Sequence, residues 1–214
     1  MGITERKHRE REQRRQQIMV AAKKLFAAKG FSRATIEDIA KEAELSPGTL
    51  YLYFKNKDEL FAALSIKILT YLISRLEKLC TEKGLTPGQR LIALKDVLYD
   101  ACAFDSWILI NTFRLQASDT LQNLSSELVA EIESRTHQIV AIMAEIFKQG
   151  MSTGTFIKRP PNEVASALWA MFSGAVLFDE SQRNMDENSR PLLTLDSAFD
   201  IFSRGITSPT RLPA

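Results

Sequence analysis

Residues 46–57 form a short segment in which side chains that can bind an acidic polymer are concentrated. Threonine and tyrosine hydroxyls donate hydrogen bonds to phosphate oxygens, and tyrosine rings pack against sugars or thymine methyl groups. Backbone N–H groups where helices begin nearby add further phosphate contacts. This pattern favours nucleic-acid binding. The candidate contact residues are Thr35, Ser46, Pro47, Gly48, Thr49, Tyr51, Tyr53, Lys55 and Lys57.

Other residues with catalytic or metal-binding potential are few and scattered. The chain has two histidines, His8 and His137, and two cysteines, Cys80 and Cys102, in unrelated places. It contains no metal-ligand spacing, glycine-rich phosphate loop or nucleophile motif. We therefore expect that the protein is not an enzyme and that it binds no cofactor and no metal. Two cysteines without a disulfide framework favour a reducing, cytoplasmic location.

Two short helices must present the segment, and the sequence contains signals for both. Thr35 is a good N-cap for a helix over 36–43, and Ser46, followed by proline, begins a second helix that reaches about Phe54. A helix of about eight residues is ~12 Å long and matches the ~12 Å major groove. The competing interpretation is two packed helices with an aromatic surface. The small and apolar positions that lock the pair are Ile36, Ile39, Ala40, Ala43, Leu45, Leu50 and Phe54.

Helical signals continue through the rest of the chain, and no stretch alternates polar and apolar residues as a strand would. We predict an all-α fold of about nine helices, with an N-terminal three-helix DNA-binding domain followed by a larger helical ligand-binding and dimerisation domain. No segment offers ~18 consecutive apolar residues, so no membrane span is expected. Helices are expected over 18–29, 57–82, from 86, from 105 or 106 to about 118, from 125 or 126 to 150, from 161 or 162 to about 179 and over 193–204.

A dense pattern of apolar, glycine and lysine positions comprises Ile18, Ala22, Leu25-Phe26, Lys29-Gly30-Phe31, Ala34-Thr35-Ile36, Ile39-Ala40, Ala43, Leu45 to Tyr51, Tyr53-Phe54 and Lys57 to Phe61. This pattern resembles the DNA-binding domain of the TetR family of regulators. The resemblance implies a homodimer with a four-helix interface and an effector pocket in the helical body. Glu44 departs from the pattern, because this turn position is often glycine in the family. A left-handed conformation there should strain a glutamate modestly.

The N-terminal extension before Ile18 is basic. Residues 1–60 contain 13 Lys and Arg against 9 Asp and Glu, although the net charge of the whole chain is only +2. Residues 4–17 have no apolar side chain and are either a helical extension or a disordered arm. Their charges would contact phosphates or a minor groove, or else form a solvated overhang. The candidate arm residues are Arg6, Lys7, Arg9, Arg11, Arg14 and Arg15.

The predicted helical body contains aromatic side chains that would line a pocket or fill a core. An apolar lining favours a hydrophobic or aromatic small-molecule effector, and Arg114 would favour an anionic group. The candidate pocket residues are Tyr71, Tyr99, Cys102, Phe104, Trp107, Phe113, Arg114, His137, Phe147 and Trp169.

The last two helices are candidates for the dimer interface. The helix from Pro161 is apolar nearly all round and must be buried on several sides. A strip of small residues would permit close helix approach. The candidate interface residues are Ala167, Ala170, Gly174, Leu195, Phe199 and Phe202.

These observations give one leading function and one alternative. The leading function is a homodimeric transcriptional repressor that binds a palindromic double-stranded DNA operator and is released by an effector. The helix over 57–82 would link the effector pocket to the DNA-binding domain. The alternative is a DNA-binding regulator without a small-molecule effector, controlled by a protein partner. The expected domains are a basic extension over 1–17, a helix-turn-helix domain over 18–61, an effector-binding and dimerisation domain over 62–206 and a flexible tail over 207–214.

Overall fold

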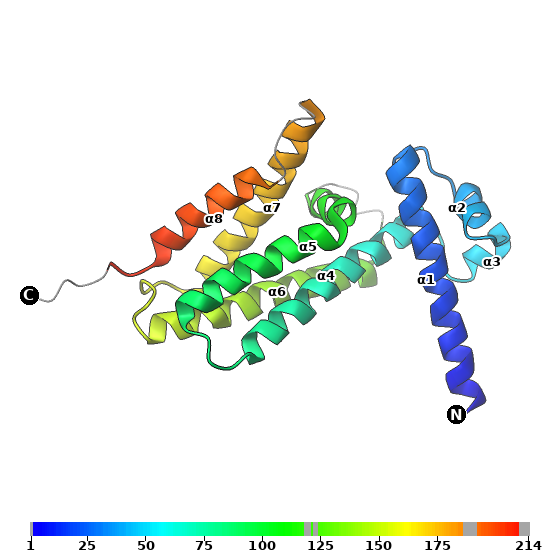
Figure 1. Ribbon diagram of the computed structural model, residues 1–214. Helices are drawn as coiled ribbons and strands as arrows, with labels where there is room; N and C mark the ends of the chain where they lie inside the picture. The colour runs from blue at the N-terminus through cyan, green and yellow to red at the C-terminus, as the bar shows by residue number, and fades with distance from the viewer. Residues whose placement is uncertain (1, 118–120, 122–123, 186–191, 210–214) are drawn as a thin grey trace, which may run out of the picture.

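The computed structural model describes residues 2–117, 121, 124–185 and 192–209. This part of the chain is helical without β-strands, which confirms the predicted all-α fold (Figure 1). Eight helices are present in it, close to the predicted nine. They are α1 (Ile3–Lys29), α2 (Ile36–Glu42), α3 (Pro47–Tyr51), α4 (Lys57–Thr81), α5 (Pro87–Gln116), α6 (Ser126–Ser152), α7 (Pro161–Met185) and α8 (Leu193–Ile206).

A break within α5 accounts for the difference in helix number. Asp105 has the extended backbone angles φ −163° and ψ 82°, so α5 consists of two helical halves that meet there. The sequence predicted a new helix at this position. The carboxylate of Asp105 accepts a hydrogen bond from the backbone N–H of Ile108 (3.2 Å), and it therefore caps the second half of α5.

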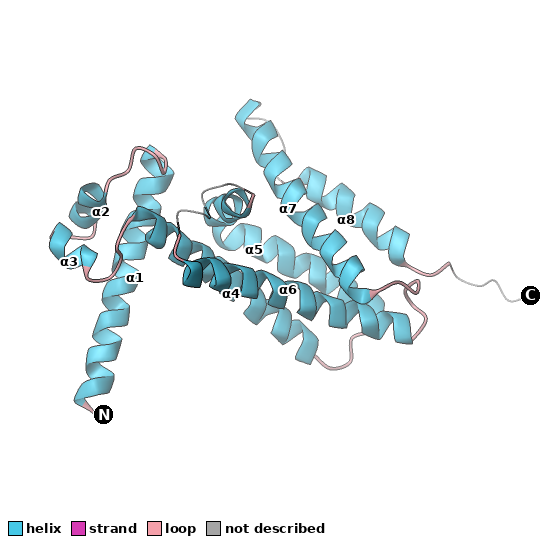
Figure 2. Ribbon diagram, turned by 180° about the vertical axis from the view of Figure 1, so that it is seen from behind, coloured by secondary structure: helices cyan, strands magenta, loops and turns pink. Residues whose placement is uncertain are grey.

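Helix α1 runs without interruption from Ile3 to Lys29. Of the two alternatives for residues 4–17, the structure therefore has the helical extension. The extension is continuous with the first helix of the predicted DNA-binding domain. Its N-terminal end projects past α2 and α3 (Figures 1 and 2).

The three N-terminal helices and the start of α4 pack into a small head. Phe26, Ile39 and Leu50 are fully buried between them. The Phe26 ring lies 5.2 Å from the Phe31 ring and 6.2 Å from the Phe61 ring, measured between centroids. An aromatic cluster therefore joins α1 to α4 beneath the short helices.

Helices α4 to α8 form the body, in which α4 packs against α5 and α6, and α7 packs between α6 and α8 (Figure 2). Helix α7 ends at Met185 rather than near Asp179 as expected. Its polar last turns continue the helix and carry an ion pair between Glu180 and Arg183 at the i,i+3 spacing. Helix α8 also ends slightly later than expected, at Ile206.

A short bridge fixes the C-terminal end of α8 to the loop between α6 and α7. Phe156 and Thr207 form an isolated antiparallel bridge, and the backbone N–H of Ser208 donates to the carbonyl of Thr155 (2.9 Å). Thr207 and Ser208, the first residues of the expected flexible tail, take part in these contacts. Residues 210–214 of that tail lie outside the described residues.

Candidate nucleic-acid interface

The two short helices of the head are capped as their sequences predict. The hydroxyl of Thr35 accepts a hydrogen bond from the N–H of Asp38 (3.1 Å), and the hydroxyl of Ser46 accepts one from the N–H of Thr49 (3.1 Å). The Ser46 hydroxyl also lies 2.9 Å from the Thr49 hydroxyl. These caps fix where α2 and α3 begin and hold Thr49 in the first turn of α3.

The turn between α2 and α3 contains the expected departure from regular geometry. Glu44 has a φ of 56°, in the left-handed region that favours glycine. The carbonyl of Ala43 accepts a hydrogen bond from the Gln17 side chain of α1 (2.8 Å), and the N–H of Leu45 donates to Ala40 (2.8 Å). Contacts on both sides therefore hold Glu44 in a conformation that costs about 1 kcal/mol.

Helix α3 is shorter than predicted, and of the candidate contacts Thr49, Tyr51 and Tyr53 only Tyr51 is exposed, the other two being partly buried. The assigned helix ends at Tyr51 rather than near Phe54, although the N–H of Phe54 still donates to Leu50 (3.1 Å). Leu50 and Phe54 are buried, whereas 50% of Tyr51 and 74% of Leu52 are exposed. Leu52 was not among the predicted contacts, because an apolar side chain in an apolar run carries no signal of exposure.

Gly48, in the first turn of α3, is not required by the fold. A Cβ atom added there would meet only the Ser46 hydroxyl, at 3.9 Å, which is ordinary van der Waals contact. Its neighbours Ser46 and Pro47 are also exposed. Neither packing within the chain nor an unusual backbone conformation therefore demands glycine at this position.

The lysines at the start of α4 differ in their surroundings. The Lys57 ammonium donates to the carbonyl of Phe31 (2.8 Å) and lies 4.5 Å from that ring, with further bonds to Ser32 and Ala34 (both 3.3 Å). Lys57 therefore fastens the loop after α1, a role that the sequence did not predict. Lys55 is exposed, but its N–H donates to Glu59 (2.7 Å), so that amide is not available to a phosphate.

Comparisons with known proteins place this head among bacterial regulators. Residues 18–64 match the model described as "Bacterial regulatory proteins, tetR family". The chain is 32% identical over 155 residues to the HTH-type transcriptional regulator HbdR of Aromatoleum sp. (strain CIB), covering 71% of this chain and 63% of that protein. It is 40% identical over 63 residues to an uncharacterised HTH-type transcriptional regulator of Haemophilus influenzae, covering 29% and 34%. The chain thus spans less than two thirds of either relative.

A solved structure extends the similarity to the whole fold. The MbdR regulator of Azoarcus sp. CIB superposes with a TM-score of 0.71 at 19% identity, over 89% of this chain and 97% of that one. The head of this chain therefore resembles the DNA-binding domain of TetR-family regulators. The two relatives are named as HTH-type transcriptional regulators, and the solved structure is that of a regulator.

The body of the chain contains a cavity of about 460 Å³ between α5, α7 and the start of α8. Of the ten residues predicted to line a pocket, only Tyr99 and Cys102 line this cavity. Burial, together with the charge of Asp179, raises the pKa of the Cys102 thiol to about 12, so the thiol is protonated near neutral pH. The whole lining is Tyr99, Asp100, Cys102, Ala103, Ser106, Leu109, Ile110, Val176, Asp179, Glu180, Arg183 and Leu192.

The other predicted pocket residues are dispersed. Trp107 and Arg114 line a smaller hollow of about 320 Å³ beside α1, which shares Ser106, Ile110, Glu180 and Arg183 with the first. His137 is exposed on α6. The remaining predictions are aromatic residues that pack against one another or the core: Tyr71 on Phe104, Phe113 on Trp169 and Phe147 on Phe156. The expected single aromatic pocket is therefore not formed, because most of these rings fill space between helices.

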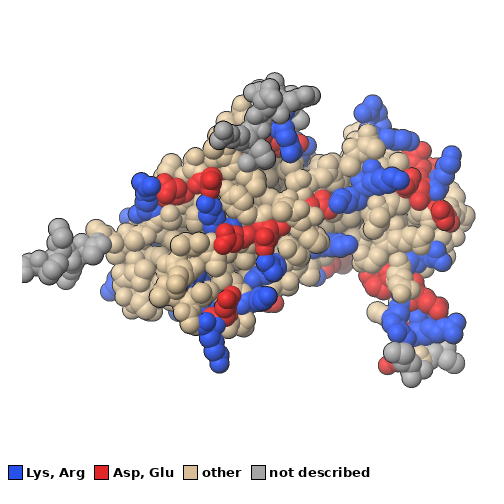
Figure 3. Space-filling model, viewed as in Figure 1, with Lys and Arg blue, Asp and Glu red and all other residues tan. Residues whose placement is uncertain are grey.

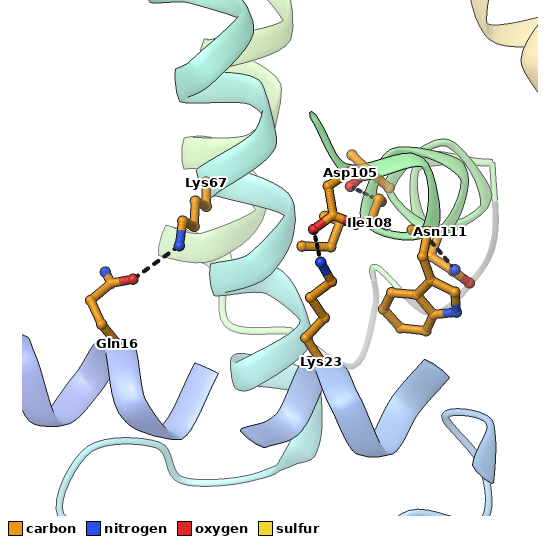
Figure 4. A network of polar contacts seen from close by, with 8 residues as sticks. Gln16, Lys23, Lys67, Asp105, Ile108 and Asn111 are labelled. Atoms are coloured by element: carbon orange, nitrogen blue, oxygen red, sulfur yellow. Dashed lines mark hydrogen bonds and ion pairs between the residues drawn. The ribbon is translucent and has the colours of Figure 1, made fainter. Parts of the chain in front are cut away.

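A polar and aromatic junction joins head and body beside the cavity (Figure 4). Lys23 of α1 forms an ion pair with Asp105 at the break in α5. The Trp107 ring stacks on Phe26 of the head with 6.2 Å between centroids. Gln16 accepts a hydrogen bond from Lys67 of α4 (3.2 Å). These contacts could not be predicted from the sequence, since Lys23 and Asp105 are far apart along the chain.

The predicted dimer residues fall into two groups. Ala167, Ala170 and Gly174 are exposed along one side of α7, and a Cβ added at Gly174 would meet nothing within 4 Å. Leu195 and Phe199 are instead buried within the protomer, where the hydrophobic side of α8 faces its own core. Phe202 also points inward, with its ring 5.9 Å from that of Phe147. Two large apolar residues of α8 are exposed, Leu193 at 56% and Ile201 at 71%.

Two further findings concern the described part of the chain. None of its helices combines the length and the apolar character needed to cross a lipid bilayer. Within the same residues, no three side chains of His, Cys, Asp or Glu come together in a way that could hold a metal ion.

Proposed function

We propose that this chain is a TetR-family regulator, a homodimeric repressor that binds a palindromic operator through α3 and is released by a small molecule bound in its body. The observation that carries the proposal is the exposed face of α3, where Tyr51 projects beside Gly48. Hydroxyls and rings of this kind contact phosphates and thymine methyl groups, while a glycine lets the backbone approach DNA closely. Ser46, Pro47, Thr49 and Tyr53 complete the proposed surface, Thr35 and Lys55 flank it, and Lys57 supports it from within.

Opposite effects on folding and on binding test this surface. Gly48→Ala should stabilise the protein by up to about 1 kcal/mol, because alanine is the better helix former. The same change should weaken operator binding about tenfold, because the added methyl group stands where DNA approaches. The operator is first selected from a random duplex library. Fluorescence anisotropy then gives the affinity, and thermal unfolding gives the stability.

A second variant separates the tyrosine from general surface effects. Tyr51→Ala should weaken operator binding about tenfold with little change in stability, since half of the side chain is exposed. Ile92→Ala on α5 is the matched control, because it removes a 63% exposed apolar side chain from the body and should leave affinity unchanged. Wild-type affinity in both Gly48→Ala and Tyr51→Ala would refute the proposed surface.

For the dimer we propose the exposed side of α7 together with the outer side of α8. Small residues permit close helix approach, and Phe178 and Ile201 supply exposed apolar area beside them. Such a pairing would hold two α3 helices ~34–36 Å apart for successive major grooves. Gly174→Trp should dissociate the dimer without unfolding the protomer, whereas Ile92→Trp at an exposed position of α5, outside the proposed interface, should not. Analytical ultracentrifugation measures both, and an unchanged dimer in the Gly174 variant would contradict the interface.

We propose the cavity of about 460 Å³ as the effector site, since its size is typical of ligand pockets. Its apolar walls favour a hydrophobic or aromatic body for the ligand. Cys102, Ala103 and Ser106 of the lining flank Asp105, which is paired with Lys23 of the head. These contacts favour the broken helix α5, rather than α4 alone, as the route from ligand to head.

This route is tested by a variant that breaks the contact between α5 and the head. A panel of apolar and aromatic compounds is first screened by thermal shift. A compound that binds tightly should weaken operator affinity of the wild type. Asp105→Asn should keep ligand binding but lose most of this response, because the amide can still cap Ile108 but cannot pair with the Lys23 charge. If every tight ligand leaves operator affinity unchanged, the switch is refuted.

A further inference from the structure

The N-terminal extension of α1 carries a row of basic side chains that continues the buried stripe of the head. Lys7, Arg11 and Arg15 are spaced by four residues, and the row continues through Ile18 and Ala22. Residues at this spacing lie on one side of a helix. Ile18 and Ala22 are buried in the head. The three basic residues therefore lie on the side of α1 that faces α3.

Contacts with the end of α3 confirm this orientation. The Arg15 guanidinium lies 4.8 Å from the centre of the Phe54 ring. The Arg11 guanidinium lies 6.0 Å from the centre of the Tyr53 ring, a cation–π distance. Arg11 is thus beside the proposed DNA-binding surface. N-terminal to it, α1 projects beyond α3, and the space-filling view shows basic side chains on this end (Figure 3).

The acidic residues of the extension lie on other sides of the helix. Glu10 and Glu12 are each one residue from Arg11, which turns them about 100° away from it. Arg6 forms an ion pair with Glu10 (2.9 Å), and Glu12 accepts a hydrogen bond from Gln16 (2.9 Å). The side that faces α3 is therefore basic, whereas the remaining sides mix both charges.

We propose that Lys7 and Arg11 lie on the sugar-phosphate backbone of duplex DNA next to the site read by α3. This inference rests on the proposed operator binding through α3. The helix rises ~6 Å between the two residues, so both can reach one strand. In Figure 1 the N-terminal end of α1 projects on the side of the molecule opposite to α7. With α7 at the dimer axis, the extension would contact DNA that flanks the operator rather than its centre.

A pair of charge-matched variants tests the proposal. Lys7→Gln/Arg11→Gln removes two positive charges from the side that faces α3, and Arg6→Gln/Arg9→Gln removes two from other sides. Affinities are measured by fluorescence anisotropy at several salt concentrations, on the selected operator and on the same duplex extended at each end by one helical turn, ~10 base pairs. Circular dichroism confirms that the helix content of both variants is unchanged.

The wild type should bind the extended duplex roughly tenfold more tightly than the short one at ~0.1 M salt, and Lys7→Gln/Arg11→Gln should lose this gain. The slope of log affinity against log salt should fall by about 1.8 for this variant and by much less for Arg6→Gln/Arg9→Gln. Equal losses in the two variants, or no loss in either, would overturn the proposal. Failure of the wild type to bind any selected duplex would instead refute the proposed function itself.

Discussion

The head and the body of this molecule are stabilised in different ways. In the head, side-chain caps on Thr35 and Ser46 fix short helices through contacts only three residues apart. In the body, long helices pack through apolar side chains, and the functional features arise where distant segments meet, as at Lys23 and Asp105. Local signals therefore specify the surface that meets DNA, whereas long-range packing specifies the cavity and its connection to the head.

The largest expected effect tests whether the head is independent of the body. Phe26→Ala should destabilise the protein by about 3–5 kcal/mol, because this buried ring contacts Phe31, Phe61 and Trp107. Urea unfolding is then monitored in a Trp169→Phe background, once by the fluorescence of Trp107 and once by circular dichroism. If the junction couples the two regions, the two unfolding transitions should coincide. Separate transitions in the parent Trp169→Phe protein would show an independent head.

A smaller loss of stability is expected from a substitution confined to the body. A Cβ atom at Gly150 would overlap the ring of Phe156, which is buried beneath the bridge to Thr207. Gly150→Ala should therefore destabilise the protein by about 1–3 kcal/mol. Urea denaturation measures the loss, and Gly88→Ala, where a Cβ meets nothing within 4 Å, is the control. Equal stabilities of the two variants would contradict tight packing at Gly150.

Relief of strain in the head should have a smaller effect of opposite sign. Glu44→Gly should stabilise the protein by roughly 0.5–1 kcal/mol, because glycine adopts a φ of 56° without steric cost but loses more entropy on folding. Thermal unfolding measures the gain. Glu44→Ala keeps the steric cost and should bring no comparable stabilisation. A gain as large in the alanine variant would mean that charge, and not backbone strain, limits this turn.

The smallest effect expected is dependent on pH. A hydrogen bond from Lys29 is the largest cause that lowers the pKa of Asp38 in the folded head. A lowered carboxyl pKa stabilises the fold above the unfolded value, about 3.9, and this stabilisation is lost as pH falls through the folded value. Asp38→Asn should therefore lower the melting temperature slightly near pH 7, and the difference should shrink as pH falls below the unfolded value and through the folded one. A difference independent of pH would exclude the ionised pair as its source.

The contrast between the two regions also explains how much could be predicted. The fold class and the caps at Thr35 and Ser46 were predicted because each depends on neighbours within a few residues, whereas the left-handed turn at Glu44 was expected from the family resemblance. The inward orientation of Leu195 and Phe199 was not, since an apolar side of a helix fits its own core as well as a partner. The exposure of His137 and the scattering of the aromatic residues likewise depend on which helices become neighbours.

The candidate DNA surface likewise combines features that local sequence predicts with features that depend on distant contacts. The exposure of Tyr51 followed from the helical period, but the internal bonds of Lys57 could not be predicted, because they reach back to carbonyls of the loop after α1. Only two of the residues that line the cavity, Tyr99 and Cys102, were among the predicted pocket residues. The remaining lining residues come from α5, from α7 and from Leu192 before α8, and the approach of α7 to α5 has no local signature.

The placement of the first and last helices has a practical consequence for labelling. The N-terminal end of α1 and the C-terminal end of α8 lie at opposite ends of the molecule (Figure 1). An affinity tag after α8 is therefore remote from α3, whereas one before α1 adjoins it. A donor and an acceptor fluorophore at these two ends would span the molecule, and their energy transfer would report a rotation of the head against the body in a single molecule.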